Sequence, residues 1–203
     1  MSSDKTGYMH CYRDREDLTK LEKAAISHYR DLTYAQLKWD WDIGRVELGD
    51  DCHMVNNIMR GNIPRASLTR GDKFRSSWII NRVTSAINKS PVTQEFDVIR
   101  GVEMFDALKD VKVADEFDDN AFTSFTTSQK TATSYAGRNS DGELIFLSIK
   151  LKRGDFALYV DNVEEEWLLS GHKTFKVVGI EHRDNHQGII GNKAIIYYLA
   201  ITT

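Results

Sequence analysis

Residues 161–177 read DNVEEEWLLSGHKTFKV, in which three consecutive acids precede an apolar Trp-Leu-Leu run. β-rich sequence flanks this stretch on both sides, which indicates a strand within a sheet. Side chains of a strand alternate between its faces, so Glu164 and Glu166 are expected on one face and Glu165 on the other. Runs of acids are usually solvated surface. On a strand, however, two such carboxylates can divide the work of a sugar transfer: one stabilises an oxocarbenium-like sugar and the other acts on the reacting partner.

Helical and β-rich sequence are segregated on either side of Pro91. Helices are expected within 18–37, over 54–59 and over 74–87, where apolar residues recur near the helical period. Seven β-rich runs follow, at 96–103, 121–128, 143–152, 155–160, 164–169, 174–182 and 194–202, with one short helix over 129–137. This segregation predicts an α+β fold with N-terminal helices and a β-sandwich of six or seven strands. The 203 residues are expected to form one domain, mainly helical over 1–90 and mainly β over 91–203.

Two further motifs lie in the β-rich half. In FDVIRGVE (96–103), Arg100 interrupts an apolar strand and Gly101 follows it. A guanidinium can grip a phosphate through two hydrogen bonds, and a glycine lets the backbone approach a flat ligand. In SFTTSQKTATSYAGR (124–138), hydroxyls at a strand end precede an aromatic residue and an arginine, and Ser128 is a suitable helix N-cap. Taken singly, each motif is equally compatible with an ordinary strand end or helix cap.

Taken together, the Arg-Gly strand, the F-T-T-S strand and the E-x-E strand have an order and spacing that resemble a known enzyme family. The resemblance is to the arginine/serine/glutamate class of ADP-ribosyltransferases, and most closely to the phage Alt/Mod enzymes. It runs from about Asp51 to the C-terminus. It implies a split NAD-binding β-sandwich, shared with cholera-like and clostridial toxins, and NAD⁺ as co-substrate.

The resemblance assigns NAD⁺ contacts along the chain. Arg100 matches the arginine that contacts an NAD phosphate, and Gly101 the residue whose backbone holds the nicotinamide amide. The hydroxyl motif falls on Thr126, Thr127 and Ser128, the stacking aromatic on Tyr135, a second phosphate-binding arginine on Arg138, and the asparagine and arginine of an NAD-contacting helix on Asn56 and Arg60. Cys52 and His53 occupy the region before that helix where the family often has a tyrosine.

The same resemblance gives the two glutamates separate roles. Glu166 matches the glutamate that hydrogen-bonds the nicotinamide ribose and stabilises its cationic transition state, assisted by Arg100 and Thr126. Glu164 matches the residue that faces the target, and a glutamate at this position goes with arginine acceptors. A protonated guanidinium is a poor nucleophile, so a second carboxylate is needed to orient it and accept its proton. Tyr159, in the preceding loop, is the expected aromatic contact of the acceptor.

Composition and charge limit which partners and ligands are expected. No apolar run approaches the ~20 residues of a membrane span and no secretory signal is evident, so a cytoplasmic protein without a membrane partner is expected. Two cysteines and no His/Cys cluster with ligand spacing predict no metal. The net charge is −3, but residues 60–89 are strongly basic, which suits a phosphate-bearing ligand, and residues 103–119 are acidic, which suits a basic partner.

The expected function is transfer of ADP-ribose from NAD⁺ to an accessible arginine of a partner protein, with release of nicotinamide. If the phage resemblance holds, host transcription or translation proteins are the natural targets. Three alternatives stay open: a NAD glycohydrolase toxin, a transferase that acts on a nucleic acid or another non-arginine acceptor, and a non-enzymatic binding module. The basic stretch is compatible with nucleic acid, whereas the overall acidity and the lack of a nucleic-acid-binding motif argue against it. Retention of both Glu164 and Glu166 argues against the binding module.

Overall fold

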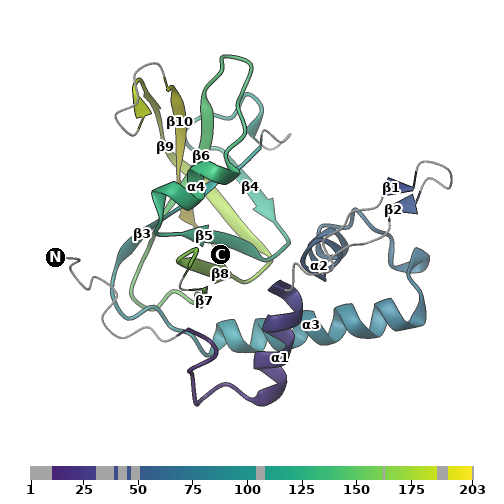
Figure 1. Ribbon diagram of the computed structural model, residues 1–203. Coiled ribbons are helices and arrows are strands. Elements are labelled where there is room, and N and C mark those ends of the chain that lie inside the picture. Colours follow the sequence, from purple (N-terminus) through teal and green to yellow (C-terminus); the bar gives the residue numbers. More distant parts are fainter. Residues whose placement is uncertain are drawn as a thin grey trace.

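Three helices form a layer beside a large twisted sheet (Figure 1). The computed structural model describes residues 11–30, 39–40, 45–46, 51–103, 108–161, 163–186 and 192–202. The helices of the layer are α1 (Lys20–Arg30), α2 (Asp51–Met59) and α3 (Arg70–Asn88), with the short 3₁₀ helix η2 (Arg65–Ser67) before α3. A two-stranded hairpin of β1 (Trp39–Asp40) and β2 (Arg45–Val46) lies at the far side of this layer (Figure 1).

The sheet has eight strands in the order β4-β9-β10-β6-β3-β5-β8-β7. β10 and β6 pair in parallel and all other neighbours are antiparallel. The strands are β3 (Phe96–Gly101), β4 (Glu116–Asp119), β5 (Thr123–Thr126), β6 (Leu144–Leu151), β7 (Leu158–Asp161), β8 (Glu166–Leu169), β9 (Lys173–Arg183) and β10 (Ala194–Ile201).

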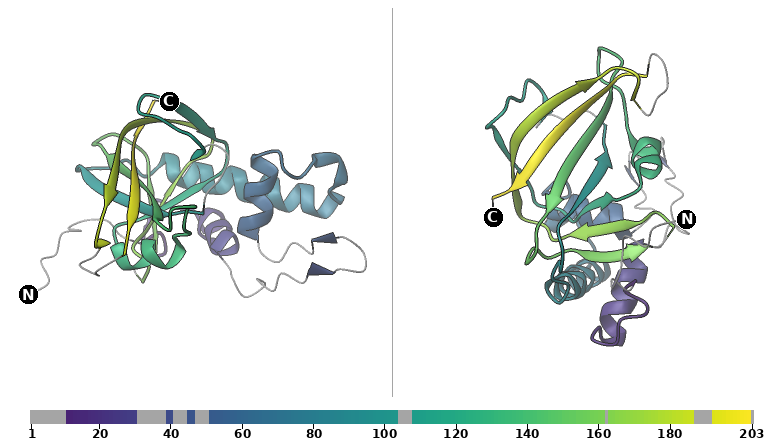
Figure 2. Two further views of the ribbon diagram at one scale, coloured as in Figure 1. Left: turned by 90° about the horizontal axis from the view of Figure 1, so that it is seen from above. Right: turned by 90° about the vertical axis from the view of Figure 1, so that its left-hand side faces the viewer.

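The sheet bends so strongly that it forms the two halves of a split sandwich. The β5, β8 and β7 half crosses the β6, β10 and β9 half at a steep angle (Figure 2). One apolar core, which includes Val98, Ile149, Trp167 and Phe175, joins residues of both halves. A second core lies between the helices and the other face of the β5–β8–β7 half. This confirms the α+β architecture expected from the sequence.

Most predicted elements are present, with two differences in the β half. The acidic run 116–119 had no strand pattern, yet it forms β4 at the sheet edge, where Phe117 packs on Phe175 of β9 with ring centroids 5.6 Å apart. The strand predicted over 164–169 begins only at Glu166, because Glu165 has a positive φ of 49° that ends the extended backbone. Part of the predicted 18–37 helical region, residues 31–37, lies outside the described residues.

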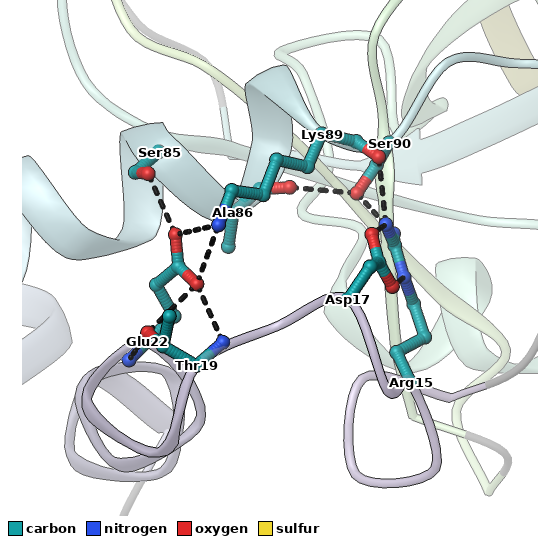
Figure 3. A network of polar contacts seen from close by, with 8 residues as sticks. All are labelled: Arg15, Asp17, Thr19, Glu22, Ser85, Ala86, Lys89 and Ser90. Carbon is teal, nitrogen blue, oxygen red and sulfur yellow. Dashed lines mark hydrogen bonds and ion pairs between the residues drawn. The ribbon is translucent and has the colours of Figure 1, made fainter.

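A buried carboxylate ties α1 to α3 in the helical layer (Figure 3). Thr19 and Glu22 form a reciprocal cap at the start of α1: the Thr19 backbone N–H donates to Glu22 at 2.7 Å and the Glu22 N–H donates to Thr19 Oγ1 at 3.2 Å. Ser85 Oγ and Lys89 Nζ of the neighbouring chain segment also donate to Glu22, at 2.6 and 2.9 Å. The layer is therefore fixed by a polar clamp as well as by its apolar core.

Candidate active site

Glu166 lies at the first position of β8, where three elements converge on its carboxylate. Ser124 of β5 donates to Oε1, and Arg30, the last residue of α1, donates to Oε2 at 2.9 Å. The Arg30 and Glu166 side chains are only 17% and 15% exposed. Arg30 also donates to the Val160 carbonyl at 3.1 Å, which fixes its guanidinium against β7. The carboxylate is thus held in one orientation, and each of its oxygens keeps a second lone pair.

Helices α1 and α2 bring further polar groups to this place. Tyr29 and Asn56 hydrogen-bond each other, with Asn56 Nδ2 donating to the Tyr29 hydroxyl at 3.0 Å. Burial raises the pKa of Tyr29 well above its usual value, and the negative charge of Glu166 raises it further. One helical turn after Asn56, Arg60 grips Asp119 with two hydrogen bonds of 3.0 and 2.9 Å, and this bond raises the pKa of Arg60.

Arg100, at the end of β3, contrasts with these paired groups. Burial lowers the pKa of its guanidinium, against the opposing charge of Asp119, and the positive charge of Arg60 lowers it further. Its side chain forms no hydrogen bond or ion pair with any described part of the chain. The charges of Tyr29 and Cys52 act in the opposite direction to burial and raise the pKa of Arg100. A half-buried cation without an anion beside it is the arrangement that an anionic ligand completes.

The predicted hydroxyl motif shapes the turn before Glu166. Thr126 Oγ1 donates to the Glu164 carbonyl at 2.5 Å, and Thr127 Oγ1 donates to Glu165 Oε2 at 2.5 Å. Ser128 caps α4 (Gln129–Tyr135), as expected, by accepting from the Thr131 N–H at 3.2 Å. The hydroxyl that reaches the Glu166 carboxylate belongs to Ser124, two residues before Thr126 on the same face of β5.

Glu164 lies in the turn between β7 and β8, two residues before β8 begins. The expected alternation of Glu164, Glu165 and Glu166 along a strand is therefore wrong. Tyr135, at the end of α4, donates its hydroxyl to Glu164 Oε1 at 2.9 Å, which raises the pKa of Tyr135. The Tyr135 ring is 58% exposed. Glu164 therefore has an aromatic face beside it that is open to a ligand.

Gly101, Arg138 and Tyr159 were also predicted to belong to the site, and each lies in a different environment. Gly101 lies under α4: a Cβ there would meet the Ala132 carbonyl oxygen at 1.9 Å, so only glycine fits. Arg138 donates to the Gly142 carbonyl and, at 3.1 Å, to Asn192 Oδ1. The Tyr159 ring packs on Trp167, with centroids 4.9 Å apart, on the face of β8 opposite Glu166.

The structure adds four residues that the sequence did not single out: Tyr29, Arg30, Ser124 and Asp119. Ser124 could have been inferred from the sequence, because it lies two residues before Thr126 and residues two apart on a strand share a face. Tyr29 and Arg30 had none, since they lie more than 130 residues from Glu166 in the chain. Tyr29 of α1 contacts Asn56 of α2, so a tyrosine from a distant part of the sequence lies beside this helix.

Two absences hold for the described part of the chain. No three His, Cys, Asp or Glu side chains come together there in a way that could hold a metal ion. No helix within the same residues is both long and apolar enough to cross a membrane.

The chain was compared with known proteins and structures. No family model and no curated protein sequence matches it. Among solved structures, the enzymatic component C2-I of the C2 toxin from Clostridium botulinum superposes with a TM-score of 0.62 and 17% identity over 92% of this chain, which spans 44% of C2-I. Plx2a, an ADP-ribosyltransferase toxin from Paenibacillus larvae, gives 0.61 and 14%, covering 92% of this chain and 88% of Plx2a.

Vis toxin, an ADP-ribosyltransferase from Vibrio splendidus, gives a TM-score of 0.60 and 19% identity, covering 91% of this chain and 75% of Vis. These three bacterial toxins share the helical layer and the bent sheet over nearly the whole of the chain described above. The protein therefore has the fold of the bacterial ADP-ribosyltransferase toxins.

Proposed function

We propose that this protein transfers ADP-ribose from NAD⁺ to an arginine of a partner protein and releases nicotinamide. The observation that carries the proposal is Arg100, a half-buried guanidinium with no anionic partner in the described chain. The pyrophosphate of NAD⁺ has the charge and the paired oxygens that such a guanidinium binds. Asn56 of α2, Arg60 directly after α2 and Tyr135 of α4 are assigned to the rest of NAD⁺. The assignment of Thr126, Thr127, Ser128, Gly101 and Arg138 to NAD⁺ remains part of the proposal.

Glu166 is assigned to the first chemical event. The bond between nicotinamide and the ribose breaks, nicotinamide leaves with the electron pair, and positive charge develops on the sugar. A preoriented carboxylate stabilises that charge without having to reorganise. Ser124 and Arg30 hold Glu166 in that orientation.

Glu164 is assigned to the second event. The arginine nitrogen attacks the anomeric carbon, and a new carbon–nitrogen bond forms as the proton of the nitrogen passes to a carboxylate. Glu164 lies in a turn beside the exposed ring of Tyr135, so an incoming side chain has access to it. We propose further that the protein is allied to the phage Alt/Mod enzymes and acts in a bacterial cytoplasm on host transcription or translation proteins. This last step rests on analogy.

The decisive experiment measures both products. The protein is incubated with labelled NAD⁺ and agmatine, a small guanidino compound, and then with bacterial lysate. Released nicotinamide and labelled agmatine are expected together, and mass spectrometry of labelled lysate proteins is expected to place ADP-ribose on arginine. Nicotinamide release without any labelled acceptor would support a glycohydrolase instead, and label on nucleic acid would replace the protein acceptor.

Arg100 gives the binding test. Arg100→Gln is expected to weaken NAD⁺ binding about tenfold or more, because a charge-assisted bidentate contact is lost. The matched control is Arg65→Gln, which removes an exposed arginine bonded only to Ser77 among the described residues. Calorimetric titration with NAD⁺ measures both. Equal dissociation constants for the two variants would remove Arg100 from the NAD⁺ site.

A further inference from the structure

A cavity of about 640 Å³ lies on the face of β8 opposite Glu166, outside the site described above. Tyr159 of β7 and Trp167 of β8 are paired residues that form its aromatic floor. Two loops form its walls: residues 14–17 before α1, and residues 89–93 after α3. A cavity of this size accommodates a ligand of several residues or a large side chain with its neighbours.

Trp167 lines this cavity and has one buried polar group without a partner. The residue is only 2% exposed, and its ring packs between Phe96 and Tyr159 with centroid distances of 4.6 and 4.9 Å. Within the described chain, its indole Nε1–H is the one buried side-chain donor that has no acceptor. A buried donor without a partner is costly, and native proteins rarely keep one without a use.

Some of the charged side chains at the rim of the cavity have hydrogen-bond or ion-pair partners, and others have none in the described chain. Arg15 is held by Asp17, by Ser90 and by the Lys89 carbonyl, and Lys89 Nζ is held by Glu22 (Figure 3). Asp14 and Glu16 are exposed, and in the described chain neither side chain has a hydrogen-bond or ion-pair partner. Both cations are thus already used, and the charges left to a ligand are two carboxylates. Together with an aromatic floor, they select a cationic group, because a guanidinium or ammonium is attracted by both.

We propose that this cavity binds a basic segment of the acceptor protein, with an arginine or lysine between the aromatic floor and the Asp14–Glu16 rim. The inference rests on the proposed function, since it gives the acceptor a second point of contact. Glu164 lies three residues before Trp167, in the turn that leads into β8. The strands that floor the cavity are the ones joined by the turn that carries Glu164. A segment seated here therefore holds the rest of its protein next to the acceptor end of the site.

Binding is tested first without NAD⁺, so that the result does not depend on catalysis. The probe is a synthetic twelve-residue peptide with an Arg-Lys-Arg block, added to ¹⁵N-labelled protein. The chain has four tryptophans, and the indole signal of Trp167 is the one lost in Trp167→Phe. We expect the peptide to shift that signal. We expect Asp14→Asn/Glu16→Gln to weaken binding about tenfold, and Trp167→Phe to weaken it about threefold or more.

The matched control is Asp110→Asn/Asp141→Asn, which removes the same charge from exposed positions outside the cavity lining. It should bind the peptide as the wild type does. An unmoved Trp167 signal overturns the proposal, as does equal loss of affinity in the two double variants. A shift caused by an RNA oligonucleotide or by anionic lipid vesicles, with none from the basic peptide, overturns it as well.

Kinetics then separate this site from the chemistry. For a peptide that carries an acceptor arginine beside the basic block, the KM is expected to rise about tenfold in Asp14→Asn/Glu16→Gln at unchanged kcat. Agmatine, which is too small to span both places, should be modified by this variant at the wild-type rate. A parallel loss with agmatine would overturn the docking role. If the wild type modifies neither substrate but the Trp167 signal still shifts, the proposed function fails and the basic-peptide site stands.

Discussion

Two carboxylates in this molecule have nearly the same kinds of partner, but one is enclosed within the helical layer and the other lies where several elements meet. Glu22 in the helical layer binds a lysine and two hydroxyls, and Glu166 at the start of β8 binds an arginine and a hydroxyl. Glu22 is 1% exposed, and the partners described above all come from α1 with its cap and from α3 (Figure 3). Glu166 lies at the junction of α1, β5 and β8, its side chain is 15% exposed, and its charge acts on Tyr29.

Under the proposed function Glu166 is catalytic and Glu22 is not, so pairing by itself does not mark a catalytic carboxylate. A fully enclosed pair contributes to the stability of the layer in which it is buried. A partly exposed pair at the junction of several elements is one that a ligand can reach. Each carboxylate can be neutralised by one atom's change, Glu to Gln, so the comparison is directly testable.

Glu166→Gln is expected to have the largest effect. It should lower the turnover of nicotinamide release by about a hundredfold or more, because it removes a negative charge needed only as the sugar becomes cationic. NAD⁺ affinity should change little, whereas the melting temperature should fall by a few degrees, because a Gln amide cannot accept from both Ser124 and Arg30 and leaves that partly buried guanidinium without its carboxylate. Steady-state kinetics and thermal unfolding measure the two. Wild-type turnover in this variant would break the assignment of Glu166.

Glu164→Gln is the next largest, and it should divide the reaction. The sugar bond can still break, so slow hydrolysis of NAD⁺ should persist while transfer to agmatine falls about thirtyfold or more, because no carboxylate takes the guanidinium proton. Parallel assays of nicotinamide and of modified agmatine give the ratio. If both fall together, Glu164 serves NAD⁺; if neither falls, the acceptor is not arginine.

Glu22→Gln should affect stability and leave chemistry intact. The variant should lose about 2 kcal/mol of unfolding free energy, because a charge-assisted buried contact to Lys89 becomes a neutral one. For a chain of this length that corresponds to about 4–8 °C in melting temperature. Turnover at a temperature where both proteins are folded should be unchanged. A large loss of turnover without loss of stability would erase the distinction from Glu166.

The same position predicts a pH dependence. Burial favours the neutral form of Glu22, but the hydrogen bonds from Lys89, Ser85 and Thr19 outweigh it and lower the pKa from 4.5 to about 2. A lowered folded-state pKa gives stability that is present above pH 4.5 and is lost as the pH falls toward 2. Denaturant unfolding between pH 5 and pH 2 should therefore narrow the gap between wild type and Glu22→Gln. A gap that stays constant would contradict the role of this charge.

Features of the fold and the site that depend on neighbouring residues could be predicted from the sequence, whereas contacts between residues far apart in the sequence could not. Strand and helix patterns are local, so the α+β layout and the E-x-E, Arg-Gly and hydroxyl motifs were accessible. The partners of Glu166 were not, because Arg30 joins it across 136 residues and Ser124 across 42. The turn at Glu165 was also hidden, since an acidic residue with positive φ leaves no clear local pattern. Edge strand β4 was missed because its acidic residues pair with β9 rather than follow β propensity.

Tyr135→Phe is expected to have the smallest effect and sharpens the comparison from the acceptor side. The variant keeps the exposed ring that is assigned to nicotinamide but removes the hydroxyl that donates to Glu164 at 2.9 Å. NAD⁺ binding and hydrolysis should therefore stay at the wild-type level, whereas transfer to agmatine should fall about threefold, the cost of one hydrogen bond that orients a carboxylate. Tyr135→Ala should in addition weaken NAD⁺ binding several-fold, because the stacking face is lost. Calorimetry and the two product assays distinguish these cases. If Phe and Ala weaken NAD⁺ binding equally, the hydroxyl rather than the ring contacts NAD⁺, and the ring would have to be removed from the NAD⁺ site.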